Sequence, residues 1–506
     1  MSSLAQPLAA NLIQSVDWLA VAPPTVAAVV AIAVLVADLF VPEARKPLLG
    51  WISVAGLAAA ALMLLPLLDG DRSTFCVHGT HACSYTADRF TLVVQFLVLG
   101  GALLSALLSV TALKDADKQL PEGEYWFLLL SSAAGAALLA ASRDLATLIV
   151  ALEVASLPAF ALVGLRHGDK KSSEAALKFF LSSVTATAVS LMGISFVYAS
   201  TGTLYLTQVA DRIQHVDSQL HTLAQTGVAL TLVGFAFKTA AVPFHFWVPD
   251  TYVGAPLPIA AYLSVVGKAV GFTGLILVTV IAFPSYADVW GPALAALAAL
   301  TMTVGNVGAL RQQATRAYSA VRLLAWSSVG QAGYLLVPIA AAAYSDDAEH
   351  SIGSTVAYAL MYAAVNLGAF AVVALVGRTR RANRITDYRG LYAKNPLAAL
   401  VMAFFLLCLA GLPPGIIGLF AKVTVFSAAV DAGLGWLAVI MAANVVVALF
   451  YYLQWTALLF RAPEGEPVRH RLPAPLTAAI TLTGVLGVAL SGAPQLILRF
   501  ADTALF

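Results

Sequence analysis

Two lysines and a histidine mark the stretch of this chain whose residue types could do chemistry. Lys238 and Lys268 each interrupt an apolar run long enough to enter a lipid bilayer, and His245 lies in the turn between the two runs. An unpaired charge at the centre of a bilayer costs at least about 2.5–3.5 kcal/mol, so each lysine needs a partner or water. We therefore interpret this stretch as the centre of an ion-transfer path rather than a catalytic pocket.

The backbone between the two lysines is expected to be irregular. The turn contains four prolines, at positions 243, 249, 256 and 258. Pro243 follows Lys238 by five positions, which predicts that the first helix breaks just past its lysine. Broken helices are tolerated at membrane depth only where protein or a wet cavity satisfies the freed backbone groups.

The composition excludes a soluble protein. The chain has 506 residues, of which 60% are hydrophobic and only 11% are charged, whereas a soluble domain has roughly 25% charged residues. We expect an integral membrane protein whose main environment is the lipid bilayer. It has no basic run with interleaved aromatic residues, so we expect no nucleic-acid partner. It also has no glycine-rich phosphate loop, so we expect no nucleotide or flavin in this chain.

Apolar runs of about 20 residues predict an all-α polytopic protein with about fourteen transmembrane helices. The predicted spans are 24–41, 50–68, 89–111, 125–142, 145–165, 174–200, 226–243, 256–282, 290–310, 318–341, 352–377, 396–430, 434–460 and 473–495.

The loops between these spans alternate between rich and poor in cations. Cytoplasmic loops carry the excess of Lys and Arg, so both termini are expected on the outer side. The cation-rich loops contain Arg45 and Lys46; Lys114 and Lys118; Arg166, Lys170 and Lys171; Arg311, Arg316 and Arg322; Arg378, Arg380, Arg381 and Arg384; and Arg461, Arg469 and Arg471.

The outer loop after the second predicted helix contains the segment CVHGTHAC, from Cys76 to Cys83. An oxidising exterior favours a disulfide between these cysteines. His78 and His81 make a metal site the alternative, although the spacing matches no standard zinc module. We therefore expect the disulfide and no metal ion. Cys408 lies in an apolar run and is expected to be an inert core residue.

Two acidic residues could partner the lysines. Glu153 interrupts the fifth predicted helix, where it is either half of a structural ion pair or a switchable partner for a buried lysine. Glu174 and Lys178 stand four positions apart in the sixth, an order that favours a helical pair. Because they lie near the cytoplasmic end of that helix, a pair that reaches the membrane surface fits equally well.

The twelfth predicted segment mirrors the seventh. Pro413, Pro414, Gly415 and Gly418 precede Lys422 in a run too long for one straight span. Two interrupted segments with one lysine each are typical of an inverted-repeat transporter. We expect residues 1–124 to hold the first three helices, 125–285 the first repeat (helices 4–8), 286–460 the inverted second repeat (helices 9–13), and 461–506 the last helix.

Further polar residues lie in the second repeat. They could line a water chain or hydrogen-bond neighbouring helices, and the second interpretation is favoured for the asparagines. They are Ser327, Ser328, Gln331, Tyr334, Asn306, Asn366 and Asn444.

An ion pair between Glu153 and Lys238 would carry enough energy to drive a proton. At an effective dielectric constant of about 20 and a separation of about 4 Å, such a pair is worth roughly 4 kcal/mol. Moving a proton against about 150–200 mV costs roughly 3.5–4.6 kcal/mol. Opening the pair could therefore push a proton from Lys238 toward Lys268, although the pairing itself is an inference.

The segment FAFKTAAVPFHFWVPDTYVGAPLPIAAYLSVVGKAVGF closely resembles the N-subunit family of bacterial NADH:quinone oxidoreductase (respiratory complex I). The similarity covers about residues 125–460 and includes SSEAALKFFLSS, LLAWSSVGQAGYLL, YAAVNLGAFAVV and NPLAALVMAFFLLCLAGLPPGIIGLFAKV. The resemblance implies fourteen helices with two inverted five-helix repeats, in agreement with the predicted spans.

The resemblance also implies roles for individual residues. Glu153 matches the glutamate of the family's fifth helix, and Lys238 matches the seventh-helix lysine with which it pairs. Lys178, Lys268 and Lys422 match the lysines of the sixth, eighth and twelfth helices, and His245 matches the histidine of the turn. Sister subunits have a glutamate at the twelfth-helix position or a long lateral helix after the last span, and this chain has neither.

Three positions depart from the family pattern. Val253 stands where the family commonly has an acidic residue, which puts a charge contact there in doubt. Ala421 replaces a common glycine, and this change would stiffen the break near Lys422. The link from Arg311 to Arg322 is longer than usual.

The resemblance implies a proton-translocating, non-redox subunit in the bacterial inner membrane. FMN, iron–sulfur clusters and quinone would be bound by partner subunits, and the partners would include the sister antiporter-like subunits. One alternative is a subunit of a multisubunit cation/proton antiporter, which would depend on a sodium gradient. Another is a structural subunit whose lysines only hold neighbouring helices together.

Overall fold

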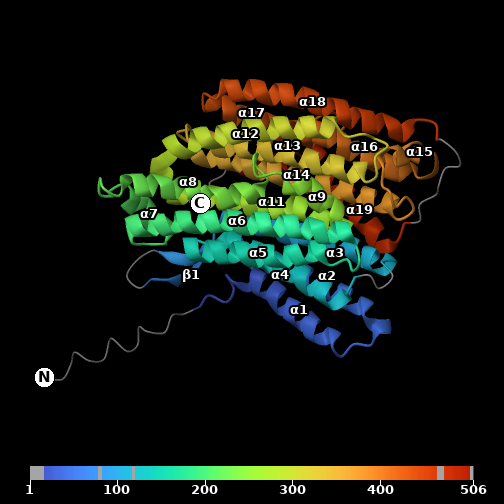
Figure 1. Ribbon diagram of the computed structural model, residues 1–506, viewed down its shortest axis with the longest axis horizontal. Helices are drawn as coiled ribbons and strands as arrows, with labels where there is room; N and C mark the ends of the chain where they lie inside the picture. The colour runs from blue at the N-terminus through green and yellow to red at the C-terminus, as the bar shows by residue number, and fades with distance from the viewer. Residues whose placement is uncertain (1–15, 78–81, 117–119, 464–471, 502–504) are drawn as a thin grey trace.

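The computed structural model describes residues 16–77, 82–116, 120–463, 472–501 and 505–506. Its helices lie side by side along the long axis of the molecule, with α1 and α2 at one edge and α17 and α18 at the other (Figure 1). Between these edges, α13 and α14 are almost completely buried, so they form the centre of the bundle.

The helices are α1 (Ala22–Asp38), α2 (Pro47–Leu62), α3 (Arg89–Asp115), α4 (Glu122–Ala141), α5 (Leu145–Gly164), α6 (Lys170–Thr201), α7 (Leu206–Ile213), α8 (His221–Thr239), α9 (Trp247–Gly254), α10 (Leu257–Tyr262), α11 (Lys268–Ile276), α12 (Ala287–Leu310), α13 (Ser319–Ala341), α14 (Ala348–Gly377), α15 (Leu391–Lys394), α16 (Pro396–Ala410), α17 (Ile416–Asp431), α18 (Gly435–Phe460), α19 (Ala474–Gly492) and α20 (Gln495–Leu498). Two π-helical turns, η3 (Leu263–Gly267) and η4 (Leu277–Ala282), flank α11. Short 3₁₀ turns are η1 (Glu43–Arg45), η2 (Leu65–Leu67), η5 (Pro284–Tyr286), η6 (Ile385–Tyr388) and η7 (Arg499–Ala501).

Aspartates fix the starts of four long helices. Asp88, Asp144, Asp169 and Asp347 each accept a hydrogen bond from a backbone N–H in the first turn of the helix that follows. An aspartate at this position satisfies one of the unpaired N–H groups of the helix end. These caps set where α3, α5, α6 and α14 begin.

The prediction of an all-helical membrane protein is confirmed. Within the described ranges, eleven helices are long and apolar enough to cross a membrane, and α1 and α16 are shorter apolar helices. Three predicted spans fall outside the eleven. The span 24–41 coincides with α1, which has 17 residues, the span 226–243 coincides with the more polar α8, and the span 396–430 is divided into α16 and α17. The count of fourteen and the division into two repeats stay predictions.

The chain leaves helical geometry at two places near lysines. The helix that carries Lys238 ends at Thr239, and the next helix begins at Trp247. The second interruption lies between Ala410 and Ile416. Both helices end on a residue with positive φ, and the second of these is Gly411 (φ 84°), whose lack of a Cβ permits that conformation.

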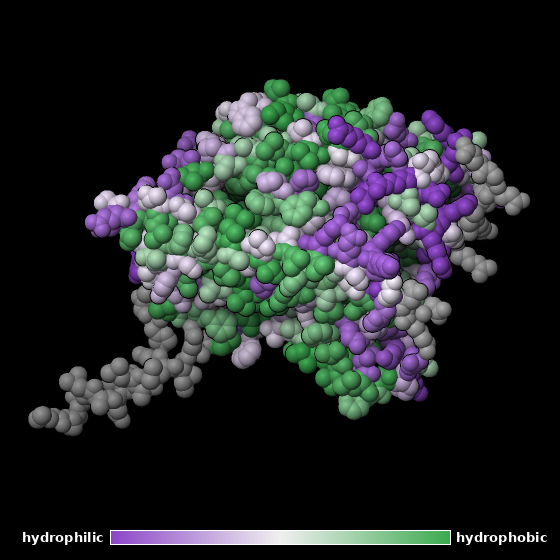
Figure 2. Space-filling view, in the orientation of Figure 1, coloured by the Kyte–Doolittle hydropathy of each residue, from purple (hydrophilic) through white to green (hydrophobic). Residues whose placement is uncertain are grey.

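Hydrophilic residues gather at one end of the bundle. Figure 2 shows a hydrophobic middle band and a dense hydrophilic surface at the right-hand end, where Figure 1 places α15. We refer to this as the cation-rich end, since the link from α14 to α15, which contains Arg378, Arg380, Arg381 and Arg384, leads there. Lys118, Arg469 and Arg471 lie outside the described residues.

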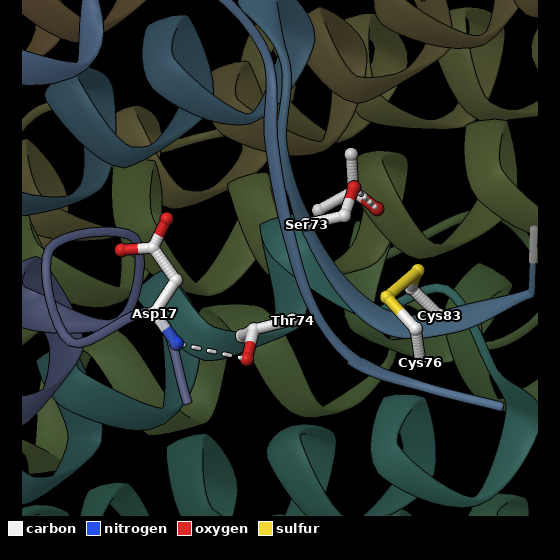
Figure 3. Close-up of a disulfide and its surroundings, with 6 residues drawn as sticks. Asp17, Ser73, Thr74, Cys76 and Cys83 are labelled. Atoms are coloured by element: carbon white, nitrogen blue, oxygen red, sulfur yellow. Dashed lines mark hydrogen bonds between the residues drawn. A yellow bond between two sulfur atoms is a disulfide. The ribbon is translucent and has the colours of Figure 1, made fainter. Parts of the chain in front are cut away.

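A disulfide-bonded hairpin covers the opposite end of the bundle. Strands β1 (Arg72–Cys76) and β2 (Cys83–Ala87) pair antiparallel, with Cys76 opposite Cys83. These two cysteines are joined by a disulfide (Figure 3). His78 and His81, the alternative metal ligands, lie outside the described residues. In the part of the chain that the structure describes, no group of three or more His, Cys, Asp or Glu side chains could hold a metal ion.

Both described ends of the chain meet this hairpin end. The backbone N–H of Asp17 donates to Thr74 Oγ1 at 3.1 Å (Figure 3), and Arg72 pairs with Asp17 at 2.9 Å. The hydrogen bond from Arg72 lowers the pKa of the Asp17 carboxyl below its ordinary value. At the other terminus, the carbonyl of Leu505 accepts from the N–H of Phe90 at 2.9 Å. The side of the membrane on which the termini lie stays a prediction.

Candidate functional site

Lys238 lies in the last turn of α8, where its side chain is 5% exposed. Its ammonium group faces the rings of Phe160, Phe179 and Phe237 at 4.8, 5.1 and 5.6 Å from their centroids. Aromatic faces attract a cation, and the carbonyl end of a helix does so as well. The site therefore stabilises a positive charge with ring faces and backbone dipoles.

A small cavity of about 20 Å³ lies beside Lys238. Ser132 and Tyr262 form its polar wall, and the hydroxyl of Tyr262 donates to Ser132 Oγ at 2.9 Å. Gly267, the residue before Lys268, lines the cavity as well. A volume of this size holds about one water molecule. The cavity therefore connects the surroundings of Lys238 with the turn that carries Lys268.

Glu153 of α5 is partly buried and has a partner on α6. The hydroxyl of Thr187 donates to Glu153 Oε1 at 2.7 Å. Among the described residues, Glu153 and Lys238 form no direct ion pair, although the carboxylate is close enough to act electrostatically on the lysine. The structure thus holds the expected pair in a separated arrangement, in which Thr187 occupies the carboxylate.

Lys268 is the first residue of α11 and is 2% exposed. Its ammonium nitrogen is buried without a hydrogen-bond partner in the described part of the chain. The residue follows the π-helical turn η3, and such turns are frequent at functional sites because they displace the helix that follows. Burying a charge without a partner is costly, so this nitrogen is the most poorly compensated of the buried lysines.

Lys422 of α17 is 3% exposed and has partners of a different kind. Its ammonium donates to the carbonyl oxygens of Leu409 and Ala410 at 2.9 and 2.8 Å, and it lies 5.5 Å from the ring centroid of Tyr334. The two carbonyls belong to the last turn of α16, where unpaired C=O groups carry a partial negative charge. The break between α16 and α17 therefore creates the site for this lysine.

Lys178 differs from the other lysines because its side chain is 46% exposed. It contacts Glu174 at 2.6 Å and Asp250 at 2.9 Å, and Asp250 contacts Arg322 at 3.2 Å. We call these four residues the surface charge cluster. The pairing with Glu174 follows the spacing of the two residues. The extension to Asp250 and Arg322 joins α6, α9 and α13.

His245 lies in the link between α8 and α9. Its ring packs against Trp326. The imidazole is partly buried, 5.6 Å from Trp326 between ring centroids, and its Nδ1 has no hydrogen-bond partner among the described residues. It lies beside α13 just before α9, and within the described ranges it forms no hydrogen bond, ion pair or ring contact with Lys238.

Sequence reasoning missed several residues of this site. Thr187 carried no signal, since a threonine in an apolar helix has many explanations. Asp250 lies in the turn between Lys238 and Lys268, and Arg322 lies at the end of the long link from Arg311. Their opposite charges at the predicted cytoplasmic end were the available signal.

Comparisons with known proteins decide the family. Residues 142–448 match a family model described as NADH:quinone oxidoreductase/Mrp antiporter. The chain is 74% identical to NADH-quinone oxidoreductase subunit N 2 of Streptomyces griseus over 98% of this chain and 96% of the relative. The chain belongs to the subunit N family. Subunit N of Salinispora tropica is 45% identical over 89% of this chain and 86% of its own length.

Solved structures agree with this membership. Respiratory complex I from Thermus thermophilus contains a chain with 30% identity to this subunit N homologue and a TM-score of 0.76, covering 94% of this chain and 98% of that one. The Mrp complex from Dietzia sp. contains a chain with a TM-score of 0.80 at 21% identity, covering 95% of this chain and 96% of that one. The second likeness shows the shared antiporter-like fold alone.

Proposed function

We propose that this chain is the proton-translocating subunit N of a bacterial NADH:quinone oxidoreductase. It assembles with the other membrane subunits of that complex, including sister antiporter-like subunits, in the inner membrane with both termini outward. It does no redox chemistry, and its partner subunits bind the flavin, the iron–sulfur clusters and the quinone. The 74% identity to a subunit N supports the assignment to this complex.

The observation that carries proton translocation is the burial of three lysines without carboxylate partners. Lys238, Lys268 and Lys422 are 5%, 2% and 3% exposed, and no ion pair joins any of them to a described carboxylate. A buried ammonium costs several kcal/mol unless it is compensated. A purely structural role would be served better by apolar side chains of similar size. A role in proton transfer, in which the side chain gains and loses a proton, explains why lysine occupies these three sites.

The separated arrangement of Glu153 supports a switch at the start of the path. Its carboxylate is bonded to Thr187 and can instead pair with Lys238. Pairing stabilises the protonated lysine, and separation favours release of its proton through the adjacent cavity toward Lys268. The proton then passes toward Lys422. The carbonyl partners of Lys422 stabilise its protonated form, and because they are neutral they still allow the proton to leave. Lys178 of α6 and His245, in the link before α9, belong to the same path.

The cation/proton antiporter is the second candidate, because the family model includes Mrp antiporters. Purification of this chain from its native membrane separates the two. Bound flavin, iron–sulfur signals and NADH:quinone activity in stoichiometric amount are expected. Sodium-dependent proton exchange without these three would establish the antiporter instead.

Substitution of Lys268 tests the proton path inside the assembled complex. Lys268→Ala is expected to leave assembly intact and to lower the number of protons pumped per NADH oxidised. Lys394→Ala, at the exposed end of α15, is the matched control and is expected to pump normally. Normal pumping by Lys268→Ala would refute the path. Failure of Lys238→Ala to assemble would instead indicate a structural role for that lysine.

A further inference from the structure

We propose that four buried hydroxyl groups carry protons from the surface charge cluster to Lys268. These residues are Tyr252, Ser328, Tyr362 and Ser264, and we call them the hydroxyl chain. The proposal rests on the proton-translocating function proposed above. It adds the route by which protons reach the central lysine from the cation-rich end of the bundle.

The route begins at Asp250. Its carboxylate contacts Lys178 and Arg322 and remains 38% exposed, so it is accessible from the surface of this chain. Arg322 lies in the first turn of α13, which begins at the cation-rich end. Under the positive-inside rule this end faces the cytoplasm. The two cations keep this carboxylate ionised, so it marks the accessible entrance of the route and does not store a proton there.

Thr251 and Tyr252 follow Asp250 in α9. Both are buried, and the hydroxyl of Thr251 has no hydrogen-bond partner in the described part of the chain. The hydroxyl of Tyr252 lies 3.5 Å from Ser328 Oγ on α13. A single bridging water would satisfy Thr251 and connect it with its neighbours. The first step therefore leads from α9 to α13.

Ser328 passes the route to α14. Its hydroxyl lies 2.8 Å from the hydroxyl of Tyr362. Ser264 of η3 is close enough to act on the Tyr362 hydroxyl, while its own hydroxyl donates to the carbonyl of Ala261 at 2.7 Å. Asn366 of α14 donates to Ser264 Oγ at 2.6 Å and so holds this serine in place. All four members of the hydroxyl chain are at most 2% exposed. A hydroxyl group can donate one hydrogen bond while it accepts another, which is the property a proton relay needs.

The route ends at the uncompensated lysine. Ser264 precedes Lys268 by four positions, so the two side chains lie on one face of the helix, about one turn apart. The ammonium of Lys268 has no hydrogen-bond partner of its own among the described residues. The route therefore runs from an exposed charge cluster to a buried amine that can accept a proton.

Interhelical hydrogen bonding without transport is the competing explanation for these hydroxyl groups, including that of Ser328. The two explanations differ in what removal of one oxygen atom does. If the hydroxyls only hold helices together, variants that assemble will pump normally. If they carry protons, pumping will fall while assembly is maintained.

The test uses Ser328→Ala and Tyr362→Phe in the whole complex, reconstituted into vesicles. Each change removes only an oxygen atom, so it adds no bulk to the core. Both variants are expected to lower protons pumped per NADH oxidised to the level of Lys268→Ala. Ser109 and Tyr125 form a similar buried pair, 2.7 Å apart, between α3 and α4. Ser109→Ala and Tyr125→Phe are therefore matched controls and are expected to pump normally.

A second pair of variants at position 328 separates the hydroxyl from side-chain volume. Thr and Val have the same shape, and only Thr has a hydroxyl group. Ser328→Thr is expected to pump more than Ser328→Val, and equal pumping by the two would overturn the proposal.

If neither variant assembles, Ser328→Ala and Tyr362→Phe decide the question alone. Normal pumping by those two variants, with pumping lost in Lys268→Ala, would refute the hydroxyl chain and leave the proposed function standing. Normal pumping by Lys268→Ala would refute the proposed function itself.

Discussion

The ammonium nitrogen of Lys422 lies 2.8 Å from the carbonyl oxygen of Ala410, the last residue of α16. A second hydrogen bond, to Leu409, has a length of 2.9 Å. Lys422 of α17 therefore caps the carboxyl-terminal end of α16. The same contact stabilises the break and provides a proton-binding group with neutral partners.

This contact predicts different outcomes for two substitutions of Lys422. Lys422→Arg keeps hydrogen-bond donors for the carbonyls, but a guanidinium group is not deprotonated in proteins. The variant is expected to assemble and to pump fewer protons per NADH oxidised. Lys422→Ala also leaves the two carbonyls without a partner, at a cost of about 1–3 kcal/mol each. It is expected to reduce both assembly and pumping.

The measurement is the amount of intact complex on a native gel together with proton uptake by reconstituted vesicles. Lys394→Arg at the surface controls for the exchange of lysine for arginine. Unchanged pumping by Lys422→Arg would contradict the assignment of Lys422 to the proton path.

The ring of Tyr334 is expected to matter more than its hydroxyl group. The ring centroid lies 5.5 Å from the Lys422 ammonium, whereas the hydrogen bond that the hydroxyl donates to the Met441 carbonyl is long, at 3.4 Å. Tyr334→Phe keeps the ring and is expected to pump normally. Tyr334→Leu removes a cation–π contact worth about 0.5–2 kcal/mol, which corresponds to about two- to thirtyfold in the stability of the charged lysine. Proton uptake in vesicles measures both, and equal effects of the two variants would exclude a role for the ring.

Thr187 is predicted to set the balance of the Glu153 switch. Thr187→Val keeps the shape of the side chain and removes the 2.7 Å hydrogen bond to Glu153. A hydrogen bond of this kind contributes about 0.5–1.5 kcal/mol net, and about 1.5–3 kcal/mol when one partner is charged. The balance should therefore move toward the Glu153–Lys238 pair by at least about twofold, and the rate of proton pumping should fall.

Thr187→Ser keeps a hydroxyl group and is expected to restore the rate. Thr185→Val on the exposed face of α6 is the matched control, since Thr185 bonds only the backbone of its own helix. A Thr187→Val variant with the pumping rate of the wild type would show that this hydrogen bond does not govern the switch.

The sequence predicted the helices well because bilayer-spanning segments follow length and apolar composition. The predicted spans 318–341 and 434–460 differ from α13 and α18 by one residue at one end each. Prolines lie in both links where the chain leaves helical geometry near a lysine, between α8 and α9 and between α16 and α17, but Pro158 and Pro338 lie inside continuous helices. That each link divides a single membrane span stays a prediction. The burial of Lys268 followed from its apolar surroundings.

The partners of the buried groups could not be predicted in the same way. The contact between Glu153 and Thr187 depends on how α5 and α6 are rotated against each other, which composition does not encode. The partners of Lys422 are backbone carbonyls, and every residue has one. The roles of the lysines in proton transfer stay predictions.

The disulfide in the outer hairpin makes a prediction that is independent of proton transfer. The chain has three cysteines; Cys76 and Cys83 are bonded, and Cys408 is free and buried. Alkylation of the denatured chain should therefore label one cysteine before reduction and all three after it. Because the hairpin contacts Asp17 through Arg72 and Thr74, the double variant Cys76→Ser with Cys83→Ser should lower the thermal stability of the complex, by about 2–4 kcal/mol at most. Its proton pumping below the melting temperature should equal that of the wild type, since the hairpin lies away from the buried lysines. Three reactive thiols before reduction would show that the bond does not form in the membrane, and loss of pumping in the double variant would show that the hairpin acts on the path.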